Sequence, residues 1–131
     1  MPNPTIPTAT LDSTSGAVAV ELVVNNPVWA SYRIDLLDAS RKPIRPIGTG
    51  YNSDTIPDRF VLKEKPADLG GCHIAFTAAV VPYAKGETVP YSVALIISQK
   101  AQGTVQGGLI QDNGQTSAPI YAAGIVKLVL A

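Results

Sequence analysis

The sequence predicts an all-β protein, built as an antiparallel β-sandwich of the immunoglobulin-like or jelly-roll kind with seven to eight strands. Apolar residues recur at every second position in most segments, which is the period of a half-buried strand. Turn-forming residues separate these segments, and eleven glycines and eleven prolines supply many of them. No segment shows the apolar spacing of a helix. A small closed barrel is the alternative architecture.

The N-terminal half of the chain contains four predicted strands. Residues 17–24 and 28–38 alternate clearly between apolar and other side chains. Residues 44–51 form a shorter strand, which Pro46 confines to a sheet edge or an irregular stretch because proline has no N–H to donate. Residues 59–63 form the fourth strand, and a loop rich in polar residues precedes it.

The C-terminal half contains three further strands and one weak candidate. Residues 72–81, 91–99 and 120–130 alternate with a period of two. Residues 103–110 are glycine-rich, which indicates a weak or bulged strand. The triplet Asp112-Asn113-Gly114 predicts a turn, because Asn and Gly accept the backbone angles of tight hairpins.

The chain length of 131 residues predicts one β-sandwich domain, over residues 16–131. Residues 1–15 contain three prolines and several Thr and Ser, which favour an extended arm. This segment lacks the basic and apolar regions of a signal peptide, and no apolar run reaches the length of a membrane helix. We therefore expect cytoplasmic synthesis, with release or assembly into a particle, and no membrane span.

Composition argues against an enzyme and against a nucleic-acid partner. Ten Lys and Arg balance ten Asp and Glu, so the chain lacks the basic excess typical of nucleic-acid binding. Cys72 is the single cysteine and His73 the single histidine, which excludes an intrachain disulfide and a Cys/His metal cluster. Because neighbours on a strand point to opposite faces, these two side chains are poorly placed to form a nucleophilic pair. We predict no catalytic residue, cofactor or dedicated metal ligand.

Aromatic and polar residues near two predicted turns suggest a ligand site. Exposed rings stack on sugars, and Asn and Asp side chains hydrogen-bond to sugar hydroxyls, so this set predicts a lectin-like, carbohydrate-binding module, with calcium assistance as one variant. The alternative is structural, since Trp and Tyr pack at strand ends and Asn and Asp favour turns. The candidate ligand-binding residues are Trp29, Tyr51, Asn52, Asp54 and Asp58.

Several predicted strands also lack a polar second face, which favours self-assembly. Ala94 and Ile96 lie opposite the predicted core residues of one strand, and Ile125 and Val129 do so in the last strand. Exposed apolar faces mark interaction surfaces, and zero net charge removes repulsion between copies. The leading hypothesis is a non-enzymatic subunit of a homo-oligomer, coat, tube or fibre. The alternative is that the rest of the chain covers these faces.

Overall fold

A computed structural model describes residues 6–14, 16–25, 28–52, 56–83, 86–101 and 104–131, with the backbone alone described at 100–101 and 104–109. These residues form nine strands and one 3-10 turn, η1. The elements in chain order are β1 (Thr8–Leu11), β2 (Val18–Val24), β3 (Val28–Leu37), β4 (Pro43–Asn52), β5 (Asp58–Val61), η1 (Pro66–Leu69), β6 (His73–Pro82), β7 (Val89–Ala101), β8 (Thr104–Thr116) and β9 (Ile120–Leu130).

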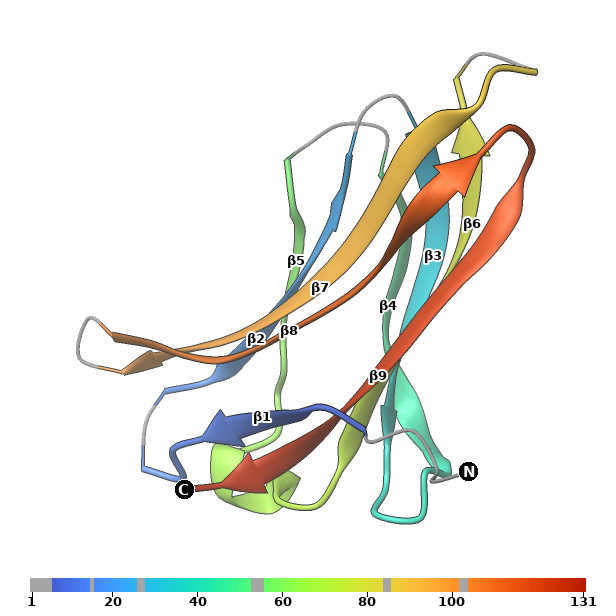
Figure 1. Cartoon of the computed structure of the whole chain (residues 1–131). Helices are drawn as coiled ribbons and strands as arrows, with labels where there is room; N and C mark the ends of the chain where they lie inside the picture. The colour runs from blue at the N-terminus through green and yellow to red at the C-terminus, as the bar shows by residue number, and fades with distance from the viewer. Residues whose placement is uncertain (1–5, 15, 26–27, 53–55, 84–85, 102–103) are drawn as a thin grey trace.

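The strands form two sheets that pack against each other (Figure 1). One sheet has five strands in the order β1-β9-β6-β3-β4, and the other has four in the order β5-β2-β7-β8. This confirms the predicted all-β class, and the two-sheet arrangement fits a β-sandwich. The immunoglobulin-like or jelly-roll subtype stays a prediction. The described residues form nine strands, one more than the seven to eight that the sequence predicts.

The core lies between the two sheets and comes from the inward positions of the alternating strands. Leu22, Ile34, Phe76, Leu95 and Leu128 each expose no more than 1% of their surface. Each of these residues belongs to a run that alternates with a period of two, so burial on one sheet face follows from the pleat of the backbone.

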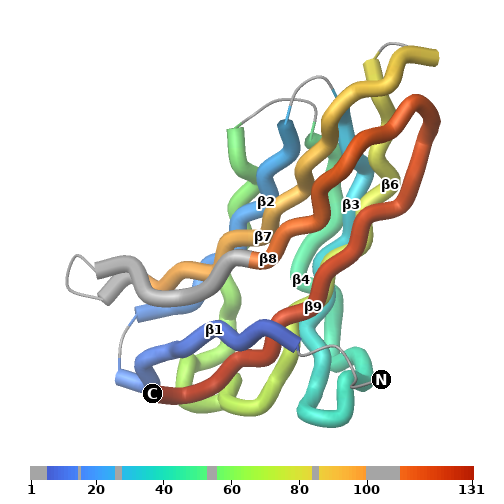
Figure 2. Tube along the Cα trace, in the orientation of Figure 1, coloured from blue at the N-terminus to red at the C-terminus, as the bar shows by residue number. Residues whose placement is uncertain are grey.

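The extra strand, β1, lies within the segment predicted to be an extended arm. It pairs in parallel with the end of β9, as the trace in Figure 2 shows, and its Ala9 and Leu11 are fully buried. The buried side chain of Gln99 holds the chain that follows β1. Its amide nitrogen donates to the carbonyl oxygens of Asp12 and Gly16, and its oxygen accepts from Asp12 N–H.

The turn predicted at Asp112-Asn113-Gly114 is wrong, because β8 runs straight through these residues. Gly114 pairs with Tyr91 of β7, and a Cβ at Gly114 would lie only 3.1 Å from the Tyr91 ring. The ring thus covers the space that the glycine leaves empty. The Asp112 carboxylate accepts hydrogen bonds from the Tyr91 hydroxyl and from Ala123 N–H. These cross-strand contacts outweigh the local turn preference of the triplet.

The edge position predicted from Pro46 is confirmed, because β4 is the outermost strand of the five-stranded sheet. The pairing of β4 with β3 shifts at this point: Ile34 pairs with Gly48, whereas its neighbour Asp35 pairs with Pro46. The extra residue, Ile47, makes a bulge beside the proline, as expected for a residue that cannot donate to the ladder.

Candidate functional site

Trp29 and Tyr51, two of the predicted ligand-binding residues, lie side by side. They come from neighbouring strands, β3 and β4, and their ring centroids are 4.9 Å apart with a 36° angle between the ring planes. Tyr51 is 55% exposed and Trp29 is half-buried. Both rings belong to the side of the five-stranded sheet that faces away from the core, so an aromatic surface borders solvent there.

The other predicted ligand residues do not join this surface. Asn52 follows Tyr51 on the strand and therefore points inward, where it is 2% exposed and its amide donates to the carbonyl oxygens of Leu22 and Ile56. Asp58 lies on β5 of the other sheet and accepts a 2.7 Å hydrogen bond from the Tyr32 hydroxyl. Asp54 lies outside the described residues.

The carboxylates do not converge into a cation site within the described part of the chain. There, no three His, Cys, Asp or Glu side chains come together around one point. Asp58 is engaged with Tyr32, and Asp38 accepts hydrogen bonds from the N–H groups of Ser40 and Lys42 in its own turn. These bonds are the local turn-stabilising role that Asp commonly plays.

The aromatic pair belongs to a broad surface on the five-stranded sheet. Period-two alternation and the strand register define which residues point outward. These outward residues, called the outer face below, are Trp29, Ser31, Arg33, Asp35 and Leu37 on β3, Thr49 and Tyr51 on β4, Ala75, Thr77, Ala79 and Val81 on β6, and Tyr121, Ala123, Ile125, Lys127 and Val129 on β9.

One row across the outer face, called the aromatic row below, has an aromatic ring at each end and small residues between the rings. The register aligns Tyr51, Ser31, Ala79 and Tyr121 on four neighbouring strands. Tyr121 is 86% exposed, the largest exposure among the described large hydrophobic residues. Because strands are about 4.8 Å apart, the two tyrosines flank a gap of roughly 14 Å with a low floor.

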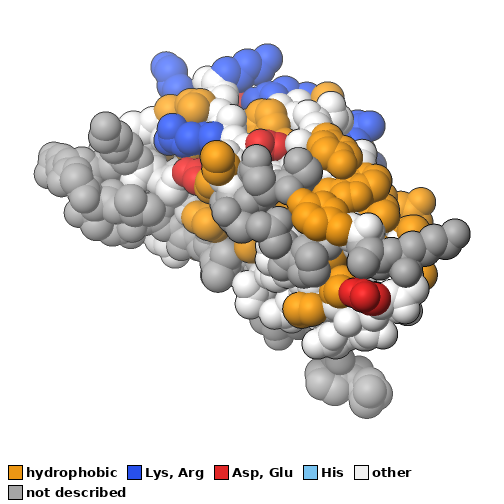
Figure 3. Space-filling model, turned by 90° about the horizontal axis from the view of Figure 1, so that it is seen from above, with side chains coloured by type: hydrophobic (Ala, Val, Ile, Leu, Met, Phe, Trp, Pro, Cys, Tyr) orange, Lys and Arg blue, Asp and Glu red, His pale blue; other side chains and the backbone are white. Residues whose placement is uncertain are grey.

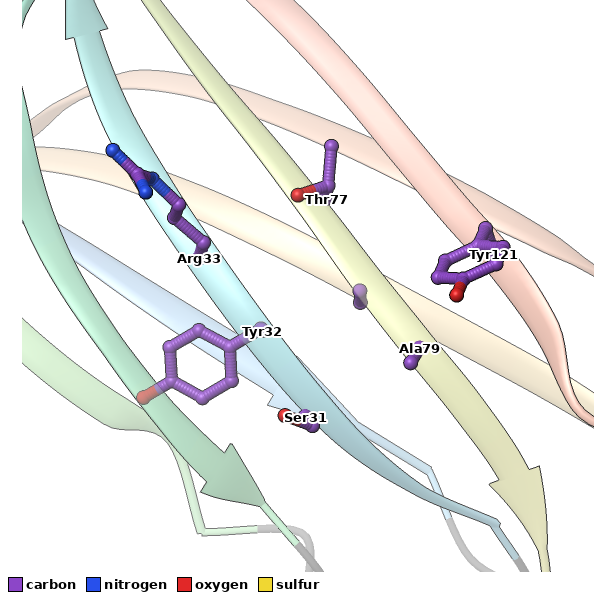
Figure 4. Close-up of a pocket in the computed structure, with 7 residues that line it drawn as sticks. Ser31, Tyr32, Arg33, Thr77, Ala79 and Tyr121 are labelled. Carbon is purple, nitrogen blue, oxygen red and sulfur yellow. The ribbon is translucent and has the colours of Figure 1, made fainter.

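A shallow depression of about 220 Å³ lies in this gap. Figure 4 shows that its side chains come from three strands: Ser31 and Arg33 from β3, Thr77 and Ala79 from β6, and Tyr121 from β9. The Tyr32 ring points away from the depression, toward the core side of β3. The lining therefore combines a hydrophobic floor and wall with hydroxyl and guanidinium groups.

The charges of the outer face largely compensate one another. Arg33 Nε donates to both carboxylate oxygens of Asp35, at 2.8 and 3.0 Å. The side chain of Arg33 is 57% exposed and that of Asp35 is 23% exposed. The one further charged residue among the outward positions defined above is Lys127, near the opposite end of β9. The part of the face around Tyr121 thus carries no uncompensated charge.

The four predicted interface residues lie on opposite sides of the molecule. Ile125 and Val129 belong to the outer face, whereas Ala94 and Ile96 point outward from the four-stranded sheet. All four side chains are half-buried. They therefore form two separate surfaces, of which the first is continuous with the aromatic row.

Exposed hydrophobic side chains also gather at the end of the molecule where Tyr51 and Tyr121 lie. Seen from above, hydrophobic side chains form a group toward the right of the view, and Lys and Arg side chains lie along its upper edge (Figure 3). Ile56 and Tyr83, which lie at the same end, are 70% and 49% exposed. The aromatic row is thus part of a wider apolar region.

A second depression, of about 400 Å³, lies between the turn after β2 and the ends of β7 and β8. Its polar groups include Asn25, whose amide donates to Pro90 O and whose oxygen accepts from Ser92 N–H. Tyr91 and Gln115 complete its wall. Because Asn25 bonds both neighbours of Tyr91, its role is to tie the turn to β7.

Sequence reasoning missed Tyr121, Arg33, Ser31 and Thr77 as parts of one surface. Each lies in a clear alternating run, so its outward direction was readable from the sequence. The order of strands in the sheet was not readable, because β9, β6 and β3 are far apart along the chain. No local signal shows that Tyr121 lies two strands from Ser31.

The chain matches no protein-family model, and comparisons with curated proteins and with solved structures find no significant match. Among the described residues, no helix has the length and apolar composition that spanning a bilayer requires.

Proposed function

We propose that this protein is a non-enzymatic subunit that assembles with further copies of itself through the outer face of its five-stranded sheet. The observation that carries the proposal is the row in which the exposed rings of Tyr51 and Tyr121 flank a low floor of small residues. The half-buried ring of Trp29 packs beside Tyr51. Trp, Tyr and Arg are enriched where protein interfaces bind most strongly, and Arg33 lies beside this floor.

The size of the outer face supports this role. Four strands at about 4.8 Å spacing and ten residues at about 3.4 Å rise span roughly 600 Å² in projection per copy. Two such faces bury roughly 1,200 Å² together, which exceeds the ~1,000 Å² expected of a specific interface. The internal Arg33–Asp35 pair also supports it, because contact would not bury an unpaired charge there.

Sedimentation and light scattering over a range of concentrations test the proposal. We expect the wild-type protein to form dimers or larger assemblies, and Tyr121→Asp to weaken association at least tenfold by placing a charge in the contact. Val61→Asp is the matched control, because Val61 is 58% exposed on β5 of the other sheet. A wild-type protein that stays monomeric at the highest concentrations contradicts the proposal.

Carbohydrate recognition is the second candidate function, and the Trp29–Tyr51 ring pair favours it. A tilted pair of partly exposed rings offers a stacking surface for a sugar ring, and Ser31 and Thr49 on the same face offer hydroxyl groups. A glycan array, read with and without a calcium chelator, tests this function. Binding that Trp29→Ala removes and Val61→Ala leaves intact supports it, and an array without any binding contradicts it.

A further inference from the structure

We infer that two copies pair about a two-fold axis, with Tyr121 of each copy seated in the depression of the other. This inference rests on the proposed self-assembly and specifies how the outer faces meet. It begins from the fact that a projecting side chain and a depression of about 220 Å³ lie next to each other on one face.

The arrangement of these two features suits a two-fold pair. An isologous interface requires each copy to present both a group and the surface that receives it. Tyr121 stands on β9 and forms one wall of the depression, which extends over Ala79, its register partner on β6, to Ser31 on β3. The centre of the depression is thus roughly 5–10 Å from Tyr121, one to two strand spacings away. A two-fold axis that passes between Tyr121 and the centre of the depression places the Tyr121 of each copy over the depression of the other copy.

The lining of the depression matches a tyrosine side chain chemically. Ala79 supplies an apolar floor for the ring, and Ser31 and Thr77 supply hydroxyl groups for the phenol. Buried tyrosines combine these two requirements, an apolar contact for the ring and a hydrogen-bond partner for the hydroxyl. Arg33 at the rim offers a cation close to the face of an incoming ring.

The opposite side of the molecule offers no such pair of features among its described residues. The outward positions of the four-stranded sheet include Val23, Ala94 and Ile96, with an ion pair between Glu21 and Arg59 at 3.5 Å. The described pocket nearest to this sheet is the polar one that Asn25 ties together. Because the outer face of the five-stranded sheet carries both partners of the contact, association through it closes at two copies.

Site-specific cross-linking tests the two-fold arrangement, first in a variant that leaves Tyr121 unaltered. In a Cys72→Ser background, Ala123→Cys places a thiol two residues from Tyr121 on the exposed outer face, close to the inferred axis. A short bifunctional maleimide should capture most of this variant as a covalent dimer. Val61→Cys, on the other sheet, is the matched control and should give at least tenfold less dimer. Adding Tyr121→Ala to Ala123→Cys should abolish capture, and so should Thr77→Arg, which fills the depression.

Each outcome separates the inference from the proposed function. Capture through Ala123→Cys that depends on Tyr121 supports the two-fold pair. Association of the wild-type protein without such capture, or capture equal to that of Val61→Cys, overturns the two-fold pair and leaves self-assembly standing. A wild-type protein that is monomeric in sedimentation, together with an Ala123→Cys variant that is not captured, overturns both.

Discussion

Tyr32 carries a polar group into the contact between the two sheets. Its side chain lies in the core with 5% exposure, yet its hydroxyl donates to Asp58 Oδ2 at 2.7 Å. Tyr32 belongs to β3 of the five-stranded sheet and Asp58 to β5 of the other, so this bond joins the sheets. Arg45 of β4 in turn holds the segment between β5 and η1, through two guanidinium–carboxylate bonds to Glu64 at 2.5 and 2.6 Å.

We expect Tyr32→Phe to lower the free energy of unfolding by about 1.5–3 kcal/mol, the usual contribution of a hydrogen bond to a charged group. Chemical denaturation monitored by circular dichroism measures this change. Tyr121→Phe is the control, because its ring is exposed and its hydroxyl has no described partner within the chain. Equal stability of Tyr32→Phe and the wild-type protein would contradict a stabilising bond between the sheets.

The same tyrosine predicts a loss of stability in alkali. Burial, then the hydrogen bond to Asp58 and its negative charge, raise the pKa of Tyr32 above its ordinary value of about 10. Above that pH the unfolded chain releases the proton while the folded protein keeps it, so stability falls as pH rises. Thermal unfolding from pH 8 to 11 should show a steeper decline for the wild-type protein than for Tyr32→Phe. Parallel declines would count against this cause.

At the scale of elements, β1 shows how a short strand without a strong sequence signal is held in place. Four residues alone pair with β9, which is too little for an independently stable strand. Burial of Ala9 and Leu11 adds to the stability of β1. The three hydrogen bonds of Gln99 to Asp12 and Gly16 hold the chain that follows it. Gln99 is fully buried, so its side chain serves the neighbouring backbone rather than solvent.

Replacing Gln99 with Leu should release β1. The change leaves backbone groups of Asp12 and Gly16 without their partner, at a cost of about 1–3 kcal/mol. Hydrogen exchange should then become faster in the amides of β1 while those of β3 keep their relative protection. Ser98→Ala, one position away and half-buried on the opposite side of the strand, is the control. Unchanged exchange in β1 would show that burial alone anchors the strand.

At the scale of the whole molecule, the two sheets turn two different surfaces outward. The surface of the five-stranded sheet carries the aromatic row, whereas that of the four-stranded sheet carries small and aliphatic residues around the Glu21–Arg59 pair. Assembly through one surface closes at a pair of copies, but assembly through both would continue into a stack. The predicted interface residues divide between these surfaces and can therefore distinguish the two cases.

Ile125→Lys and Ile96→Lys form a matched pair for this purpose, since both isoleucines are half-buried on outward positions. We expect Ile125→Lys to shift the protein toward monomer by tenfold or more and Ile96→Lys to leave its solution mass unchanged. Sedimentation velocity at equal concentration measures both. A loss of mass in Ile96→Lys alone would place the contact on the four-stranded sheet. Circular dichroism spectra like that of the wild-type protein would verify folding.

Alternation along the sequence was sufficient to predict the all-β class and the inward side of most strands. The side chain of a strand residue points to one face or the other according to its position in the pleat, and this rule acts between immediate neighbours. The alternation predicted for residues 17–24, 28–38 and 72–81 is matched by the burial of Leu22, Ile34 and Phe76. Strand β1 was not predicted, because four residues are too few to establish a period.

Only the tertiary structure decided which strands lie side by side. The row of Tyr51, Ser31, Ala79 and Tyr121 joins the consecutive strands β3 and β4 to β6 and β9, which are distant in the chain. The order of these distant strands depends on how two whole sheets bury their apolar sides together. The straight course of β8 through Gly114 likewise depends on Tyr91 across the ladder. Side-chain direction is a property of the local backbone, whereas strand neighbours are chosen by contacts over the entire fold. The core could thus be read from the sequence, and the outer face could not.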